Sequence, residues 1–101
     1  MKTRRVRFTV TAQAQVRREK QWWLANRDHV EIFATEMREA LRVVKLWPGA
    51  GTVYRHARVQ GVRRFYLPKV AYHLYYTFDD EEVIVRALWG ARRGRGPVLA
   101  R

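Results

Sequence analysis

The chain has neither cysteine nor serine among its 101 residues. Without cysteine there is no disulfide framework, no thiolate nucleophile and no zinc–thiolate site, which also fits a reducing compartment. Without serine there is no serine nucleophile for hydrolysis. The sequence therefore excludes thiol redox chemistry and serine hydrolase chemistry.

Long apolar runs are also absent. The first residues alternate Val6, Phe8 and Val10 with polar residues instead of forming the continuous apolar stretch of a signal peptide, and no later segment has the length and apolar character of a membrane span. We therefore expect a cytoplasmic protein with no membrane contact.

Metal-ligand spacing is missing as well. His29, His56 and His73 are far apart in the sequence, and the acidic run at 79–82 is more typical of a solvated turn than of a cation site. We expect no metal and no cofactor.

Negative charge is scarce and confined to two places. Nine Asp and Glu stand against 21 Lys and Arg, giving a formal net charge of +12, and all nine acids fall within 19–39 or 79–82. The stretches 40–78 and 83–101 carry only basic charges. Such a balance attracts a polyanion or an acidic partner, although a merely solvated basic face is the simpler interpretation.

The length suits one compact domain, which we expect to span residues 1–101. No repeat or interior linker interrupts the chain. The glycines and arginines near the C-terminus indicate a loose basic tail from about residue 92.

The N-terminal half predicts one strand and two helices. Val6, Phe8 and Val10 alternate as in a half-buried strand. Thr11 is then expected to cap a first helix that ends near Asn26.

The second helix has a clearer pattern. Asp28 and Glu31 have the spacing of a capping box at its start. Apolar residues then recur every three or four positions until Pro48. Two adjacent helices imply an antiparallel hairpin.

The C-terminal half changes to strand periodicity over 62–67, 72–78 and 83–89. Short connections predict an antiparallel meander, so the fold class is α+β, with the first strand joining the sheet at an edge that the sequence leaves open. Tyr75 and Tyr76 should point to opposite faces, one to the core and one to an open face.

Motifs in this half resemble those of the ParE/RelE superfamily, the toxins of bacterial type II toxin–antitoxin pairs. The resemblance rests on their order along the chain: Gly61-Val62-Arg63-Arg64, Tyr72-His73-Leu74-Tyr75-Tyr76, and the run from Val83 to Arg93. Upstream, Trp22-Trp23 and Leu46-Trp47-Pro48-Gly49 extend the likeness over nearly the whole chain.

The resemblance implies one of two activities. ParE-like members inhibit DNA gyrase by trapping it on cleaved DNA and need no catalytic residues, whereas RelE-like members cleave messenger RNA in the ribosome. The chain lacks the Tyr or His that RelE-like members usually have near the C-terminus, so a ribonuclease would depend on Arg63, Lys69 and Arg86. We favour the gyrase inhibitor; a nucleic-acid-binding domain without toxicity is a further alternative.

The partner sites follow from these expectations. Trp89 beside Arg92, Arg93 and Arg95 has the composition of a target-contacting site, unless Trp89 is core and the arginines are solvated. A cognate antitoxin with an acidic, amphipathic C-terminal segment would fold on binding and form a hetero-oligomer. Its expected contacts on this chain are Trp22, Arg63, Arg64, His73 and Tyr75.

Overall fold

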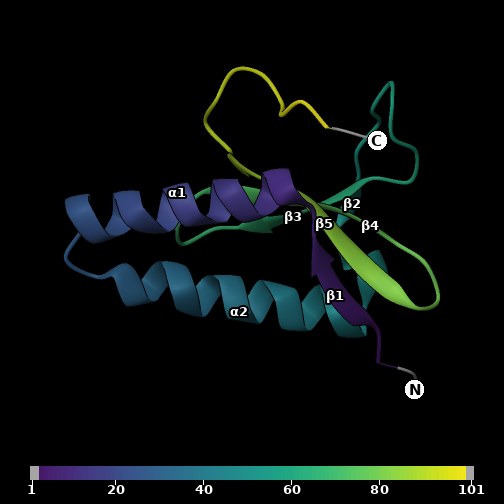
Figure 1. The fold of residues 1–101 in the computed structure, drawn as a ribbon, viewed down its shortest axis with the longest axis horizontal. Helices are drawn as coiled ribbons and strands as arrows, with labels where there is room; N and C mark the ends of the chain where they lie inside the picture. The colour runs from purple at the N-terminus through teal and green to yellow at the C-terminus, as the bar shows by residue number, and fades with distance from the viewer. Residues whose placement is uncertain (1–2, 100–101) are drawn as a thin grey trace.

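The computed structural model of the protein describes residues 3–99 as one sheet with two helices (Figure 1). The elements in chain order are β1 (Arg5–Phe8), α1 (Val10–Asn26), α2 (Val30–Leu46), the 3-10 helix η1 (Pro48–Ala50), β2 (Thr52–Val53), β3 (Arg63–Leu67), β4 (Tyr72–Phe78) and β5 (Glu82–Gly90). The predicted α+β order of strand, helix, helix and three strands is confirmed. Only η1 and the two-residue strand β2 were not expected.

The five strands form a single sheet in the order β1-β5-β4-β3-β2. β3, β4 and β5 make the expected antiparallel meander, and β1 lies at the edge, parallel to β5, with Val6 opposite Val83. The sequence did not determine which edge of the sheet the first strand joins; the structure places it beside the last strand, β5.

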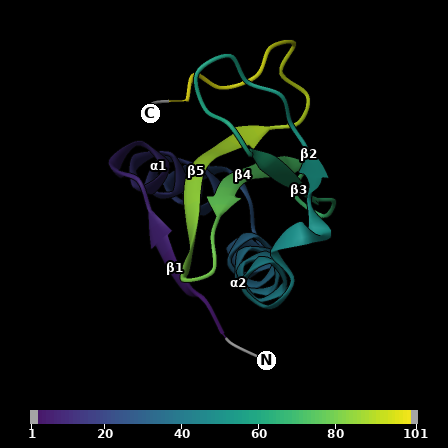
Figure 2. The ribbon, with the colours of Figure 1, turned by 90° about the vertical axis from the view of Figure 1, so that its right-hand side faces the viewer.

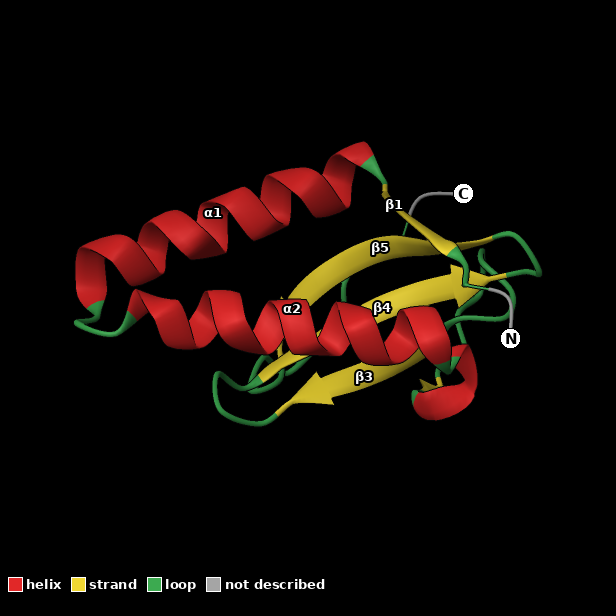
Figure 3. Ribbon diagram, turned by 90° about the horizontal axis from the view of Figure 1, so that it is seen from below, coloured by secondary structure: helices red, strands yellow, loops and turns green. Residues whose placement is uncertain are grey.

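The helices lie side by side over one face of the sheet (Figure 3). α2 contributes most of the helical side of the core, because Phe33, Met37, Ala40 and Val44 form a buried stripe along it. α1 is less deeply packed: its buried residue is Ala12, and Trp23 of its last turns stacks on Phe33 at 6.1 Å between ring centroids.

Both predicted helix caps are wrong. Thr9, rather than Thr11, caps α1 by accepting a hydrogen bond from the Ala12 amide at 3.1 Å. The strand ends at Phe8, so Val10 belongs to the helix, where its side chain is 83% exposed. At α2 the cap position is His29, with no capping side chain, so the expected box between Asp28 and Glu31 does not form.

The sheet face opposite the helices, here called the outer face, is partly covered by a second apolar cluster. Its buried members are Val59, Val62, Tyr75, Ala87 and Leu99. Figure 2 shows how this cover arises: the loop between β2 and β3 and the segment after β5 lie on the same side of the sheet.

This cover corrects two expectations. Tyr75 and Tyr76 do point to opposite faces, but both are buried, with 1% and 0% exposure. The C-terminal segment is held against the sheet by Leu99, which is 1% exposed, rather than hanging loose from residue 92. Positions 1, 2, 100 and 101 of the expected domain lie outside the described residues.

Over residues 3–99, none of the helices has both the length and the apolar character needed to cross a membrane.

Candidate partner-binding site at the end of β5

The end of β5 presents an aromatic ring with exposed cations around it. The guanidinium carbon of Arg93 lies 4.2 Å from the Trp89 ring centroid, and Trp89 Nε1 donates a hydrogen bond to the Arg95 carbonyl at 2.8 Å. Trp89 also packs against the second cluster, so it is partly core and partly support for the arginines. The side chains of Arg92, Arg93 and Arg95 are exposed.

A cavity of about 340 Å³ lies beside this segment, where the last turns of α1 meet the β3–β4 turn and the end of β5. Its lining includes Trp22, Trp23 and Arg27 from the end of α1, and Arg92 and Arg93 after β5. Trp22, expected to contact an antitoxin, and two of the arginines expected to contact the target therefore share one cavity.

Tyr72 and Glu19 are also part of the cavity lining. The Tyr72 hydroxyl donates a hydrogen bond to Glu19 Oε1 at 2.6 Å and accepts one from Trp23 Nε1 at 3.2 Å. Burial, followed by the hydrogen bond to Glu19, raises the pKa of Tyr72 to about 12. The phenol therefore stays protonated at neutral pH, and the one carboxylate in the lining is engaged by it.

Indole rings of the cavity lining lie next to Arg27. The guanidinium carbon of Arg27 lies 5.3 Å from the Trp22 ring centroid and 5.8 Å from that of Trp23. Such cation–π contacts orient a guanidinium while leaving its N–H groups free to bind an anion.

The uncovered part of the outer face carries a second set of predicted residues. Tyr66 and His73 are paired across β3 and β4, with ring centroids 5.1 Å apart, and Arg64 lies over the Tyr54 ring at 5.3 Å. Burial, and then the charge of Arg64, lower the pKa of His73, so its imidazole is neutral at neutral pH. Its Nδ1 atom is buried without a hydrogen-bond partner in the described structure.

The expected antitoxin contacts are thus spread over different surfaces. Arg64 and His73 lie on the outer face and Trp22 lies at the end of α1, whereas Tyr75 is buried and presents no surface to a partner. Tyr66, which is 48% exposed beside His73, is a surface aromatic that our sequence reasoning missed. Its alternation with buried Leu67 was the available signal.

The three cations expected of a ribonuclease lie on different elements. Arg63 donates a hydrogen bond to the Gly51 carbonyl at 2.7 Å and pairs with Tyr76, a residue of the helix-side core. Arg86 is the extra residue of a bulge in β5 and donates to Thr77 Oγ1 at 2.9 Å. Lys69 lies in the β3–β4 turn, after the last residue of β3, whereas Arg63 is the first residue of that strand.

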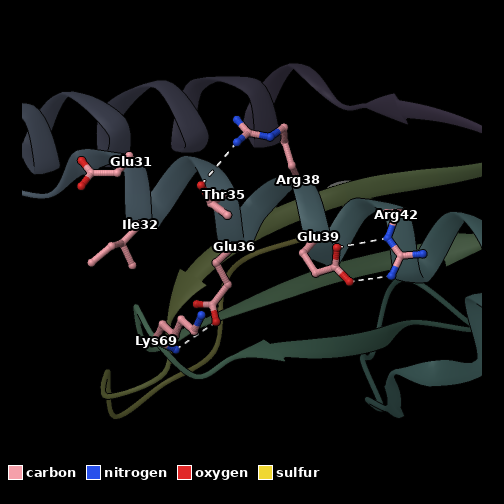
Figure 4. A pocket seen from close by; sticks show the side chains of 8 residues that line it. All are labelled: Glu31, Ile32, Thr35, Glu36, Arg38, Glu39, Arg42 and Lys69. Atoms are coloured by element: carbon pink, nitrogen blue, oxygen red, sulfur yellow. Dashed lines mark hydrogen bonds and ion pairs between the residues drawn. The ribbon is translucent and has the colours of Figure 1, made fainter.

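A larger groove of about 820 Å³ runs along the solvent side of α2 and was not predicted (Figure 4). Its charges are largely satisfied internally: Arg42 donates to Glu39 at 2.6 Å, and Glu36 accepts hydrogen bonds from the Lys69 and Val70 amides at 3.1 Å each. Acidic and basic residues three positions apart on α2, such as Glu39 and Arg42, could have predicted a surface whose charges pair with one another.

Within residues 3–99 the structure brings together no group of three or more His, Asp or Glu that would hold a metal ion.

The fold defines an α+β domain in which a two-helix hairpin covers one face of a sheet whose first strand is parallel to its last. This is a ParE-like fold. A chain of the chromosomal ParDE TA system from P. aeruginosa superimposes on it with a TM-score of 0.70 and 13% sequence identity, covering 89% of this chain and 98% of that one. No protein-family model and no curated protein sequence matches the chain.

Proposed function

We propose that the protein is the toxin of a type II toxin–antitoxin pair acting in the cytoplasm. The observation that carries the proposal is the likeness to a chain of a ParDE system along nearly the full length of both chains. The exposed arginines around Trp89 add a surface suited to a negatively charged target.

Within this class, we propose inhibition of DNA gyrase. Arg63 donates to the Gly51 carbonyl, Arg86 donates to Thr77 Oγ1, and the chain after Tyr76 has no Tyr or His that could serve as an acid or base in cleavage. A gyrase inhibitor instead needs a contact surface, which Trp89, Arg92, Arg93 and Arg95 supply at the end of β5. Ribosome-dependent cleavage of messenger RNA is the competing activity.

The antitoxin proposed here is a partner with an acidic, amphipathic segment. Two accessible areas of this chain match its chemistry: the cavity with Trp22 at the end of α1, and the outer-face patch of Arg64, Tyr66 and His73. Acidic side chains on such a segment would also relieve the self-repulsion of a chain with a net charge of +12.

Expression in a bacterial host tests the proposal. The protein is induced alone or together with the product of its neighbouring gene, and growth, plasmid topology and total messenger RNA are followed. We expect growth arrest that co-expression relieves, with altered plasmid topology and intact messenger RNA. Rapid loss of messenger RNA would assign the ribonuclease activity instead. Normal growth at confirmed expression would reject the toxin and leave a nucleic-acid-binding domain.

A further inference from the structure

Arg27, Arg92 and Arg93 line one cavity without a carboxylate partner. None of the hydrogen bonds or ion pairs of residues 3–99 joins these three guanidinium groups to an acid, and the single acid of the lining, Glu19, is held by Tyr72. Three unpaired cations around a concave surface repel one another, so an anion placed between them is stabilised.

Two of these cations lie against indole rings of different segments. Arg27 lies against Trp22 and Trp23, and Arg93 lies 4.2 Å from the Trp89 ring centroid. A guanidinium fixed against an indole loses less rotamer freedom when it binds a ligand than a freely moving side chain does. The cavity is therefore preorganised for an anion.

The cationic surface continues past this cavity. A second hollow of about 420 Å³ is lined by Arg93, Gly94 and Arg95, so Arg93 borders both spaces. The two hollows thus adjoin at Arg93 and are together called the track. Trp22, 44% exposed, stands in the cavity lining where it offers an indole ring for stacking.

We propose that this track binds a single-stranded nucleic acid, with Arg27, Arg92 and Arg93 on its phosphates and Trp22 stacked on a base. A continuous cationic groove with aromatic rings is how proteins bind single strands without reading their sequence. The acidic antitoxin segment proposed above shares the charge and would cover the same cavity, so the nucleic acid would bind the free toxin. Bases add stacking on Trp22, which acidic side chains cannot supply. The inference holds whichever target the toxin acts on.

Fluorescence anisotropy with a labelled ten-nucleotide oligothymidylate tests it over a range of salt concentrations. Three phosphate contacts predict a slope of log affinity against log salt of roughly −2, because each contact on a single strand contributes about −0.7. Arg92→Ala with Arg93→Ala should reduce the slope to roughly −0.7 and weaken binding about tenfold or more at low salt. Trp22→Leu should weaken binding about fivefold by removing one stacked base.

Matched controls separate this site from general charge. Arg17→Ala with Arg18→Ala removes two exposed cations of α1 that lie outside the cavity, and should change affinity by less than about twofold. Circular dichroism of every variant confirms that it is folded. Equal losses in the two double variants would reject the site and leave only non-specific attraction.

A decaglutamate peptide completes the test. If it binds as tightly as the oligonucleotide and depends on the same arginines, the track is an acidic-peptide site and the nucleic-acid assignment is wrong. If neither probe binds while the protein still arrests growth, the track proposal fails and the toxin proposal stands.

Discussion

The hydroxyl of Tyr72 lies 2.6 Å from Glu19 and joins the second half of α1 to the first residue of β4. This hydrogen bond and the one from Trp23 add to the other contacts of α1 with the sheet, among them the bond that Gln15 Oε1 accepts from the Leu88 amide. Tyr72→Phe should lower the free energy of unfolding by about 1.5–3 kcal/mol, the usual contribution of a hydrogen bond to a charged group. Urea denaturation measures this change, and an unaltered midpoint would contradict it.

The same tyrosine predicts a pH dependence. Its pKa is raised from 10.0 to about 12, so the folded state favours the protonated phenol. The resulting stabilisation is fully present below about pH 10 and is lost as the pH rises through about 12. In a tyrosinate absorbance titration, Tyr72 and Tyr76 should both ionise late, since burial raises the pKa of each. Tyr72→Phe should remove part of that late phase; an identical late phase in the variant would refute the assignment.

Gly51 is expected to tolerate no side chain. A Cβ atom there would lie 2.5 Å from the Tyr76 hydroxyl and 2.9 Å from the Arg64 carbonyl, and Tyr76 is fixed by hydrogen bonds with Gly51 and Pro48. Gly51→Ala should lower the free energy of unfolding by about 1–3 kcal/mol through overpacking. Gly49→Ala is the control, since nothing lies within 4 Å of its added Cβ. Equal stability of the two variants would show that the contact at Gly51 is not tight.

The helix cap assigned to Thr9 can be separated from the one first expected at Thr11. Thr9→Ala removes the acceptor for the Ala12 amide and should lower the free energy of unfolding by about 1 kcal/mol. Thr11→Ala, within α1 on an exposed side chain, should have an effect below about 0.5 kcal/mol. Thermal unfolding of both variants decides between them, and the reverse order would restore Thr11 as the cap.

The C-terminal segment is predicted to be part of the folded domain. Leu99 is buried between the outer face and the loop before β3, so Leu99→Ala should lower the free energy of unfolding by about 2–4 kcal/mol. Val98→Ala is the matched control, because Val98 is 83% exposed. If denaturant midpoints of the two variants coincided, the segment would not contribute to stability.

Toxicity should be separable from stability at the end of β5. Changing Arg92, Arg93 and Arg95 together to Ala should abolish growth arrest, with stability changed by about 0.5 kcal/mol or less per site. Trp89 Nε1 donates to the main-chain carbonyl of residue 95, and this carbonyl is still present when the side chain is changed to Ala. Replacing Arg17, Arg18 and Lys20 of α1 by Ala removes the same charge elsewhere and should leave growth arrest intact.

A folded triple variant at 92, 93 and 95 that still arrests growth would place the active surface elsewhere. The outer face around Arg64, His73 and Arg86 is then the next region to substitute.

The order of elements was predictable because most of them have a clear local signal: aromatic and β-branched residues over 72–78, and an apolar residue every three or four positions along α2. The boundary between β1 and α1 at Thr9 could not be predicted, because Val10 continues the alternation of the strand. Only the parallel pairing with β5 shows that the strand ends at Phe8. The burial of Tyr75 could not be predicted from the sequence either. It depends on Leu99 and Val59, which come from segments without periodicity that meet only in the folded chain.

The candidate site was predicted in part. Composition alone singled out Trp22 and the arginines after Trp89, but nothing local connects residues so far apart in sequence, so their common cavity emerges only from the fold. Arg63 was expected to be free for a partner and instead donates to main-chain carbonyls near η1. A charged residue at a strand start gives no sign of such an internal acceptor.

The parallel pairing of β1 with β5 has a consequence for the order of events during synthesis. Arg5–Phe8 are made before their partners at Glu82–Val85, because they precede them in the chain. β1 therefore has no native neighbour in the sheet until β5 has also been made, and closing this pair joins segments that are far apart in sequence. Until then, the backbone N–H and C=O groups of β1 have no strand to pair with.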